Sequence, residues 1–396
     1  MSTQAFSPVA PDRFPARELA EAVASCARCG FCKVACPTFP FGGGFETFSP
    51  RAKVYFLKDY FEGRDVLTPE WVDRLYRCTT CERCQTVCQT AIPLVPLWEA
   101  VRADVVARGL GPMPAHKKLR ALAEAHGNPY GEPADKQSQW LLPEHKPAEA
   151  ADILVFGGCT ASYRMPSMLQ TGVTILTRLA IPYAYAGGLE NCCASPLLRT
   201  GQLDVAGELI GRNLDLFART GARTIVTPCG GCSKTLKHDY PQWARRLGKP
   251  FDITVRHFSE VYVDLLRQGR IRPTVSVEKT VTFHDPCHVG RSQGLFDEPR
   301  EILAAIPGVK LVEMPRCRES SRCCGAGGGV KANYPQMAAA IAKDRLEEAV
   351  ATGADTLVTM CPFCQGSFSQ AIKETDASIG LCGLEELLLA SLPEAR

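Results

Sequence analysis

The cysteines constrain this chain more than any other feature of its sequence. Twenty of its 396 residues are cysteine, eight of them between 26 and 88 and twelve between 159 and 382. A chain of this length can bury enough apolar surface for two or three domains, so it needs no disulfides to hold its fold. Metal ligation or redox chemistry is therefore the main use that we predict for the thiols.

Charge and hydropathy reduce the number of possible partners and locations of the protein. The formal net charge is +3, and no basic stripe interleaved with aromatic residues argues for a nucleic acid or an anionic membrane as partner. No apolar run approaches the roughly 18 residues of a membrane-spanning helix. The first residues carry no apolar segment of the signal-peptide kind. We expect a cytoplasmic protein without a membrane span, in which thiols stay reduced.

Two cysteine runs share one spacing. "CARCGFCKVACP" begins at Cys26 and "CTTCERCQTVCQ" begins at Cys78, and both read C-x2-C-x2-C-x3-C. In bacterial ferredoxins with this spacing, three thiolates of a run hold one cubane and the fourth reaches the other cubane. We assign one [4Fe–4S] cluster to Cys26, Cys29, Cys32 and Cys88, and the other to Cys78, Cys81, Cys84 and Cys36. A pair of zinc sites fits less well, because a tetrahedral ion leaves the third close cysteine without a role.

The segment between these runs predicts helices. Ser49 and Thr68 are N-cap residues, each followed by proline at the first helical position. Val54, Leu57 and Phe61 give the first of these helices an apolar face. We predict two short helices and no hairpin. This helical spacer resembles the α-helical ferredoxin modules of succinate dehydrogenase and heterodisulfide reductase.

The second half of the chain contains an internal repeat. "GARTIVTPCGGC" at 221–232 matches "GADTLVTMCPFC" at 353–364, and "DILVFGGC" at 152–159 matches "TVTFHDPC" at 280–287. In each copy a β-branched run ends in a cysteine and helical patterns intervene, which predicts two α/β units with parallel sheets. Because ligands bind beyond the carboxyl ends of parallel strands, we expect the cysteines to meet at one rim.

Each copy has five cysteines in the order C…CC…C-x2-C. They are Cys159, Cys192, Cys193, Cys229 and Cys232 in the first copy, and Cys287, Cys323, Cys324, Cys361 and Cys364 in the second. This pattern resembles the CCG domain of heterodisulfide reductase and its relatives, from about residue 150 to the end. The resemblance implies a non-cubane [4Fe–4S] cluster on the five thiols of each copy. In the family the two clusters face each other and take a disulfide between them.

The first copy departs from this pattern at one position. "NCCASP" carries Ala194 where the motif has glycine. If the backbone there needs a positive φ, alanine costs on the order of 1 kcal/mol. All five thiols are kept, and whether this copy holds a full cluster stays open.

Other residues near the cysteines have competing interpretations. His284 and His288 flank Cys287 and would donate hydrogen bonds to sulfur or, when protonated, serve as proton donors. Cys317 is interpreted as a spare buried thiol and Cys382 as a core residue beside helix-forming leucines. The glycines after Cys324 fit close approach to a cluster better than a nucleotide site.

Together these features predict the domains. They are a helical ferredoxin module at 1–110, a proline-rich connector at 111–148 and two CCG domains at 149–275 and 276–396. The resemblance implies an iron–sulfur subunit of a cytoplasmic redox complex that passes electrons between two cubane and two non-cubane clusters. It implies flavoprotein and other iron–sulfur subunits as partners and a disulfide as a candidate substrate.

Two alternatives to disulfide reduction stay open. In the first, the chain is a relay without substrate chemistry of its own, in a flavin-dependent glycolate or lactate dehydrogenase or in a benzoyl-CoA reductase complex. In the second, it is a redox-sensing or structural zinc protein. An open cleft between the two CCG rims would favour catalysis, whereas clusters covered by a partner would favour the relay.

Overall fold

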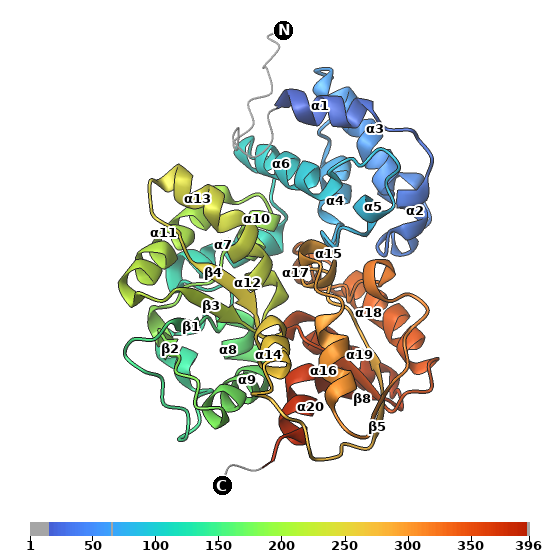
Figure 1. Cartoon of the computed structure of the whole chain (residues 1–396). Coiled ribbons are helices and arrows are strands. Elements are labelled where there is room, and N and C mark those ends of the chain that lie inside the picture. The colour runs from blue at the N-terminus through green and yellow to red at the C-terminus, as the bar shows by residue number, and fades with distance from the viewer. Residues whose placement is uncertain (1–15, 65, 394–396) are drawn as a thin grey trace.

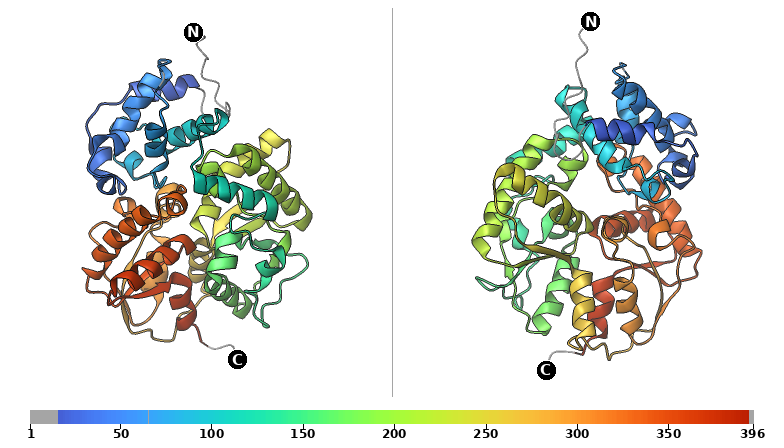
Figure 2. Two further views of the ribbon diagram at one scale, coloured as in Figure 1. Left: turned by 180° about the vertical axis from the view of Figure 1, so that it is seen from behind. Right: turned by 45° about the horizontal axis from the view of Figure 1, so that its top comes forward.

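The computed structural model describes residues 16–64 and 66–393. Figure 1 shows three parts, with a helical module at the top and two α/β units side by side below it. The back view and the tilted view in Figure 2 show the same arrangement. The helical module therefore packs against both α/β units.

The helical module holds both ferredoxin-type cysteine runs. Its helices are α1 (Ala16–Ala24), α2 (Phe31–Ala35), α3 (Pro50–Phe61), α4 (Pro69–Tyr76), α5 (Arg83–Thr86) and α6 (Leu94–Ala107). The two helices predicted between the runs are α3 and α4. The Ser49 side chain accepts a hydrogen bond from the Ala52 N–H and the Thr68 side chain accepts one from the Trp71 N–H, as N-caps do.

The proline-rich connector is more regular than its sequence indicated. It contains α7 (Pro114–His126), which ends at Gly127 with φ 69°. Pro114 and Gly127 are ordinary start and stop signals. Only His116 and Ala123 of this helix are buried, so the apolar periodicity that usually reveals a helix is missing.

Each α/β unit has one parallel sheet of four strands. The first sheet has the order β2 (Ala184–Tyr185), β1 (Ile153–Val155), β3 (Thr224–Thr227), β4 (Thr254–His257). The second has the order β6 (Val309–Leu311), β5 (Lys279–Phe283), β7 (Thr356–Thr359), β8 (Gly380–Gly383). Equal strand order in the two sheets confirms the predicted repeat and its parallel pairing. The four edge strands are short and were not individually predicted.

Helices cover the sheets and connect their strands. In the first unit they are α8 (Gly158–Arg164), α9 (Pro166–Arg178), α10 (Ser195–Arg199), α11 (Leu203–Thr220), α12 (Gly230–Lys234), α13 (Tyr240–Leu247) and α14 (Phe258–Arg267). In the second they are α15 (Gly290–Gln293), α16 (Glu298–Ala305), α17 (Val330–Asn333), α18 (Pro335–Val350), α19 (Pro362–Thr375) and α20 (Leu384–Ser391). None of the helices in the described part of the chain is long and apolar enough to cross a membrane.

The two α/β units share a core. Helix α14 at the end of the first unit packs on α16 of the second, and α20 at the end of the second packs on α9 of the first. One buried cluster accordingly includes Leu169, Phe258, Leu303 and Leu388. This reciprocal packing fixes the two sheets relative to each other.

Candidate metal centres

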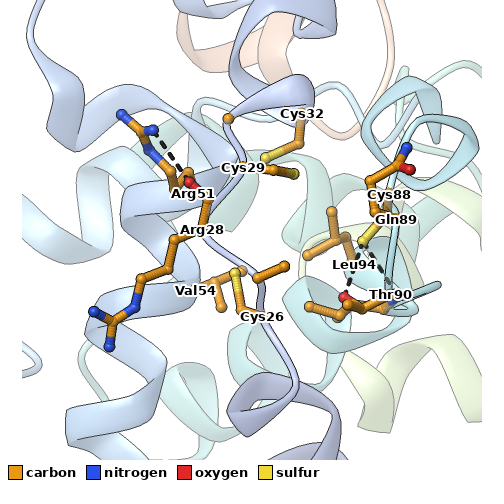
Figure 3. Close-up of a pocket in the computed structure, with 13 residues that line it drawn as sticks. Cys26, Arg28, Cys29, Cys32, Arg51, Val54, Cys88, Gln89, Thr90 and Leu94 are labelled. Atoms are coloured by element: carbon orange, nitrogen blue, oxygen red, sulfur yellow. Dashed lines mark hydrogen bonds between the residues drawn. The ribbon is translucent and has the colours of Figure 1, made fainter.

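The first cysteine group lines a small pocket in the helical module. Cys26, Cys29 and Cys32 of the first run and Cys88 of the second surround it (Figure 3), and Val54 and Leu94 add apolar walls. Burial and the neighbouring thiols raise the pKa of Cys32 to about 11. Thiols this close repel one another as thiolates, so a bound cation would stabilise their deprotonated form.

The second group lines a separate pocket. Cys78, Cys81 and Cys84 meet Cys36 of the first run there. The Thr80 N–H donates to the Cys78 Sγ at 3.5 Å, and the Cys36 Sγ lies 3.2 Å from the Thr38 hydroxyl. Each pocket thus combines three thiols of one run with the fourth of the other. This is the crossed arrangement that the spacing predicted, and four thiols in a closed pocket fit a cubane.

Lys53 is a residue of the second pocket that was not predicted from the sequence. It lies in α3, is 3% exposed and lines this pocket. Burial lowers the pKa of its ammonium group, whereas the thiolates of Cys78 and Cys36 favour its charge. Lys53 stands four residues before Leu57 on the buried side of the helix. A lysine on that side was the sequence signal for a buried negative partner.

All ten cysteines of the repeats line one cavity of about 490 Å³. Nine of them are less than a tenth exposed, and Cys287 is half-buried. Within the first set the Cys159 and Cys192 Sγ atoms lie 3.6 Å apart. Within the second, those of Cys324 and Cys364 lie 3.3 Å apart. Ten neighbouring sulfur donors fit iron–sulfur ligation.

The two sets also meet each other. Cys229 follows β3 and caps α12, and Cys361 follows β7 and caps α19. Both thiols line the same cavity, and they influence each other's pKa across the two units. Because both sets line one cavity, the carboxyl ends of the two sheets face one another, as the family resemblance implied.

The second set also lies against the helical module. The Cys81 and Cys323 thiols belong to one buried cluster, and Cys323 together with burial raises the pKa of Cys81. Arg291 spans the same junction, where it donates to the carbonyl oxygens of Cys81 at 2.7 Å and Ser321 at 2.6 Å. The first set has no such contact to the ferredoxin-type cysteines among the interactions of the described residues. The two cysteine sets are thus unequal in their contacts with the ferredoxin-type cysteines.

The glycines after Cys324 contribute to this junction. Gly328 and Gly329 have φ of 60° and 81°. A Cβ on Gly327 or Gly328 would collide with the carbonyl oxygens of Thr79 or Cys78, respectively. The sequence led us to expect that these glycines lie close to a cluster. In the structure they also let the cysteine loop of the helical module approach the second repeat.

The CC motif shows why its next position favours glycine. Gly325 has φ 84°, and Ala194 takes the same left-handed conformation with φ 69°. The expected strain at Ala194 is therefore present. The backbone at Ala194 nevertheless has the conformation that glycine has at this position in the second repeat. All five thiols of the first set line the cavity.

The two histidines beside Cys287 differ in position. His284 is buried, its Nδ1 accepts from Arg345 Nε at 3.3 Å, and its ring lies beside the Sγ atoms of Cys324 and Cys364. His288 lines the cavity and donates through Nε2 to the Thr80 carbonyl oxygen at 3.3 Å. Burial lowers the pKa of both rings, that of His288 to about 4. Both are neutral at neutral pH in this environment.

The two remaining cysteines lie apart from the repeat thiols. Cys317 and Cys382 are both outside the cavity. Cys382 lies partly buried in β8 and not in a helix. Neither thiol is placed to join the ten that line the cavity. Both are only partly buried, whereas the sequence led us to expect a buried thiol at Cys317 and a core residue at Cys382.

Arg199 is a cavity residue that was not predicted from the sequence. It is 2% exposed, lines the cavity and pairs with Glu99 and Asp239. Hydrogen bonds from the Cys192 and Cys232 thiols lower the pKa of Cys193, and the charge of Arg199 adds to this effect. No motif marked Arg199, because its partners come from distant segments.

Comparisons with known proteins agree with this geometry. A 4Fe-4S dicluster domain matches residues 22–92, and a cysteine-rich domain matches residues 153–237 and 281–369. The chain is 38% identical to a subunit of the dihydromethanophenazine:CoB–CoM heterodisulfide reductase of Methanosarcina barkeri, over 93% of both chains. It is 33% identical to a subunit of the fumarate reductase (CoM/CoB) of Methanothermobacter marburgensis, over 92% of this chain and 71% of that one.

A solved structure shares the fold at low identity. A hypothetical protein from Helicobacter pylori matches with a TM-score of 0.56 and 10% identity, over 87% of this chain and 68% of that chain. The matched domains indicate iron–sulfur clusters and an electron-transfer role. The chain belongs to the family of iron–sulfur oxidoreductase subunits that join a 4Fe-4S dicluster domain to two cysteine-rich domains, the family of its heterodisulfide reductase relatives.

Proposed function

We propose that the chain is the disulfide-reducing subunit of a redox complex, with two cubane clusters in the helical module and two non-cubane clusters on the repeats. The observation that carries this proposal is the cavity between the two units, which all ten repeat thiols line. The clusters themselves would fill part of this space, and the side chains that line the cavity beyond the thiols support the presence of a substrate. When bound, the clusters supply one-electron transfer and open iron positions.

The positions of the cysteine groups suggest an order for electron transfer through the chain. The first pocket is lined by residues of the helical module alone, and Cys29 is its exposed cysteine. Cys81 of the second pocket shares a buried cluster with Cys323 of the second repeat. Electrons from a partner would therefore enter at the first pocket and leave through the second pocket to the second repeat. Cys229 and Cys361 then join the two repeats.

The cavity wall beyond the thiols fits an organic disulfide. Leu119, Met165 and Phe363 are apolar, and Lys331 adds a cation whose Nζ lies 3.5 Å from the Ser367 hydroxyl. The reaction is R–S–S–R′ plus two electrons and two protons giving two thiols. The S–S bond breaks, each sulfur gains one electron, and the protons come from solvent. A flavoprotein or iron–sulfur partner subunit would supply the electrons.

The test uses anaerobically purified protein. We expect about sixteen irons per chain for four such clusters. Reduced viologen should be oxidised when the CoB–CoM heterodisulfide is added, since two relatives of the chain are named as CoB–CoM heterodisulfide reductase subunits. Cys324→Ser should abolish this oxidation, whereas Cys317→Ser, outside the cavity, should not.

The opposing outcomes are distinct. Full iron content without oxidation by the heterodisulfide or by glutathione disulfide would overturn disulfide reduction and leave the relay function. Colourless protein with bound zinc would overturn every iron–sulfur role.

A further inference from the structure

One imidazole connects the two repeats at the point where their cysteine sets meet. His257 is the last residue of β4 and is completely buried. Its Nε2 lies 3.1 Å from the Pro228 carbonyl oxygen and 3.1 Å from the Met360 carbonyl oxygen. Pro228 directly precedes Cys229 in the first repeat, and Met360 directly precedes Cys361 in the second.

The hydrogen bonds of this ring define its tautomer. Nδ1 accepts from the Ser259 N–H at 3.2 Å, as an N-cap acceptor for α14. Both atoms near Nε2 are carbonyl oxygens, which only accept. The proton is therefore on Nε2, and a single N–H is shared between the two repeats. Burial keeps the ring neutral, because it lowers the pKa of His257.

The position has no counterpart in the second repeat. Strand β8 ends at Gly383, directly before α20, as β4 ends at His257 directly before α14. Glycine offers no side chain there. At the ends of β4 and β8, the hydrogen-bonded bridge between the Pro228 and Met360 carbonyl oxygens therefore depends on His257.

We propose that His257 is a positioning residue that sets the distance between the two cysteine sets. The backbone carbonyl that precedes each cysteine is held by the same N–H, so Cys229 and Cys361 are kept next to each other at the cavity. This inference rests on the proposed function, in that both sets carry clusters. A fixed separation then allows two single electrons to reach one cavity.

Two substitutions separate this bridge from the helix cap. Asparagine is a preferred N-cap residue, but its shorter amide does not reach the two carbonyl oxygens. Glutamine is a weaker cap, but its amide N–H reaches about as far as Nε2. His257→Asn therefore keeps the cap and loses the bridge, and His257→Gln does the reverse. Glu260→Ala removes the other half of the capping box, in which Glu260 accepts from the His257 N–H at 2.7 Å.

The readout is the spin–spin interaction between the repeat clusters, measured by electron paramagnetic resonance on the dithionite-reduced full chain. Dipolar coupling falls steeply with distance. We expect His257→Asn to retain the wild-type iron content and to lose the splitting, whereas His257→Gln and Glu260→Ala retain both.

Three results would overturn the inference. They are a wild-type splitting in His257→Asn, a loss of splitting in His257→Gln as complete as in His257→Asn, and an uncoupled wild type with full iron. A failure of the proposed function is distinguishable from these results. A wild type without iron at the ten repeat thiols would show it directly, and the role of His257 in cluster spacing would fail with it.

Discussion

Arg102 donates a hydrogen bond to the carbonyl oxygen of Gly328 at 3.2 Å, across 226 positions of sequence. The same guanidinium, on α6 of the helical module, donates to the Arg199 carbonyl oxygen in the first repeat at 2.7 Å. It also donates to the carbonyl oxygens of Leu75 and Cys78 within its own module. One buried side chain therefore connects all three parts of the molecule next to the glycine loop of the second repeat.

Arg102→Met should loosen this three-way junction. It leaves four carbonyl oxygens without their donor, and buried groups left unpaired cost about 1–3 kcal/mol each, so we expect a loss of at least about 3 kcal/mol. Thermal unfolding and the rate of proteolysis in the connector measure the effect. Arg120→Met is the matched control, because Arg120 pairs with an exposed Asp204 on the surface. Equal unfolding midpoints for the two variants would contradict the role of Arg102.

At the position after each CC pair, glycine should give a higher free energy of unfolding than alanine. Ala194 has φ 69°, so Ala194→Gly should raise the free energy of unfolding by about 1 kcal/mol. Gly325→Ala should lower it by more. Gly325 has φ 84°, and an added Cβ would also collide with the Ala338 carbonyl oxygen. Urea titration of both variants tests this pair, and a destabilised Ala194→Gly would show that alanine is needed there.

The crossed pockets predict which double substitutions are redundant. Cys36 and Cys81 line one pocket, whereas Cys29 lines the other. Cys36→Ala with Cys81→Ala should lose no more iron than either change alone, about four atoms for one cubane. Cys36→Ala with Cys29→Ala should lose about twice as much. Iron analysis measures both, and the reverse ranking would assign the thiols to uncrossed clusters. Cys317→Ala is the control without iron loss.

The sequence predicted most of what depends on local pattern. The caps Ser49 and Thr68 defined α3 and α4, and the repeat of β-branched runs before cysteines defined β3 and β7. Spacing alone also predicted that Cys36 would join the second run. These patterns lie in short or repeated segments, so they can be interpreted without knowledge of the tertiary structure.

What the sequence did not predict depends on contacts between distant segments. Nothing near His257 indicates that its ring lies between Pro228 and Met360, and nothing near Arg102 indicates Gly328. Helix α7 was missed because contacts with both repeats, and not an apolar stripe of its own, determine its place. Lys53 differs from these residues, because it lies on the buried face of a predicted helix. A lysine at such a position indicates a buried negative partner.

His116 should make the stability of the junction depend on pH. Its buried Nε2 donates to the Gly329 carbonyl oxygen at 2.9 Å, and burial lowers its pKa to about 4. In the unfolded chain a histidine titrates near 6.5. Between these values the unfolded state binds more protons than the folded state, so the free energy of unfolding falls as the pH drops from 6.5 towards 4. The full loss is about 3 kcal/mol.

His116→Gln isolates this contribution, because glutamine keeps an N–H donor for Gly329 and does not titrate. Other buried histidines contribute equally to both proteins, so the comparison between variant and wild type is decisive. We expect the urea midpoint of the wild type to fall more than that of His116→Gln between pH 7.5 and pH 5. Exposed His126, at the end of the same helix, provides the control His126→Gln, which should follow the wild type. Parallel losses in all three proteins would show that His116 is protonated without cost in the folded state.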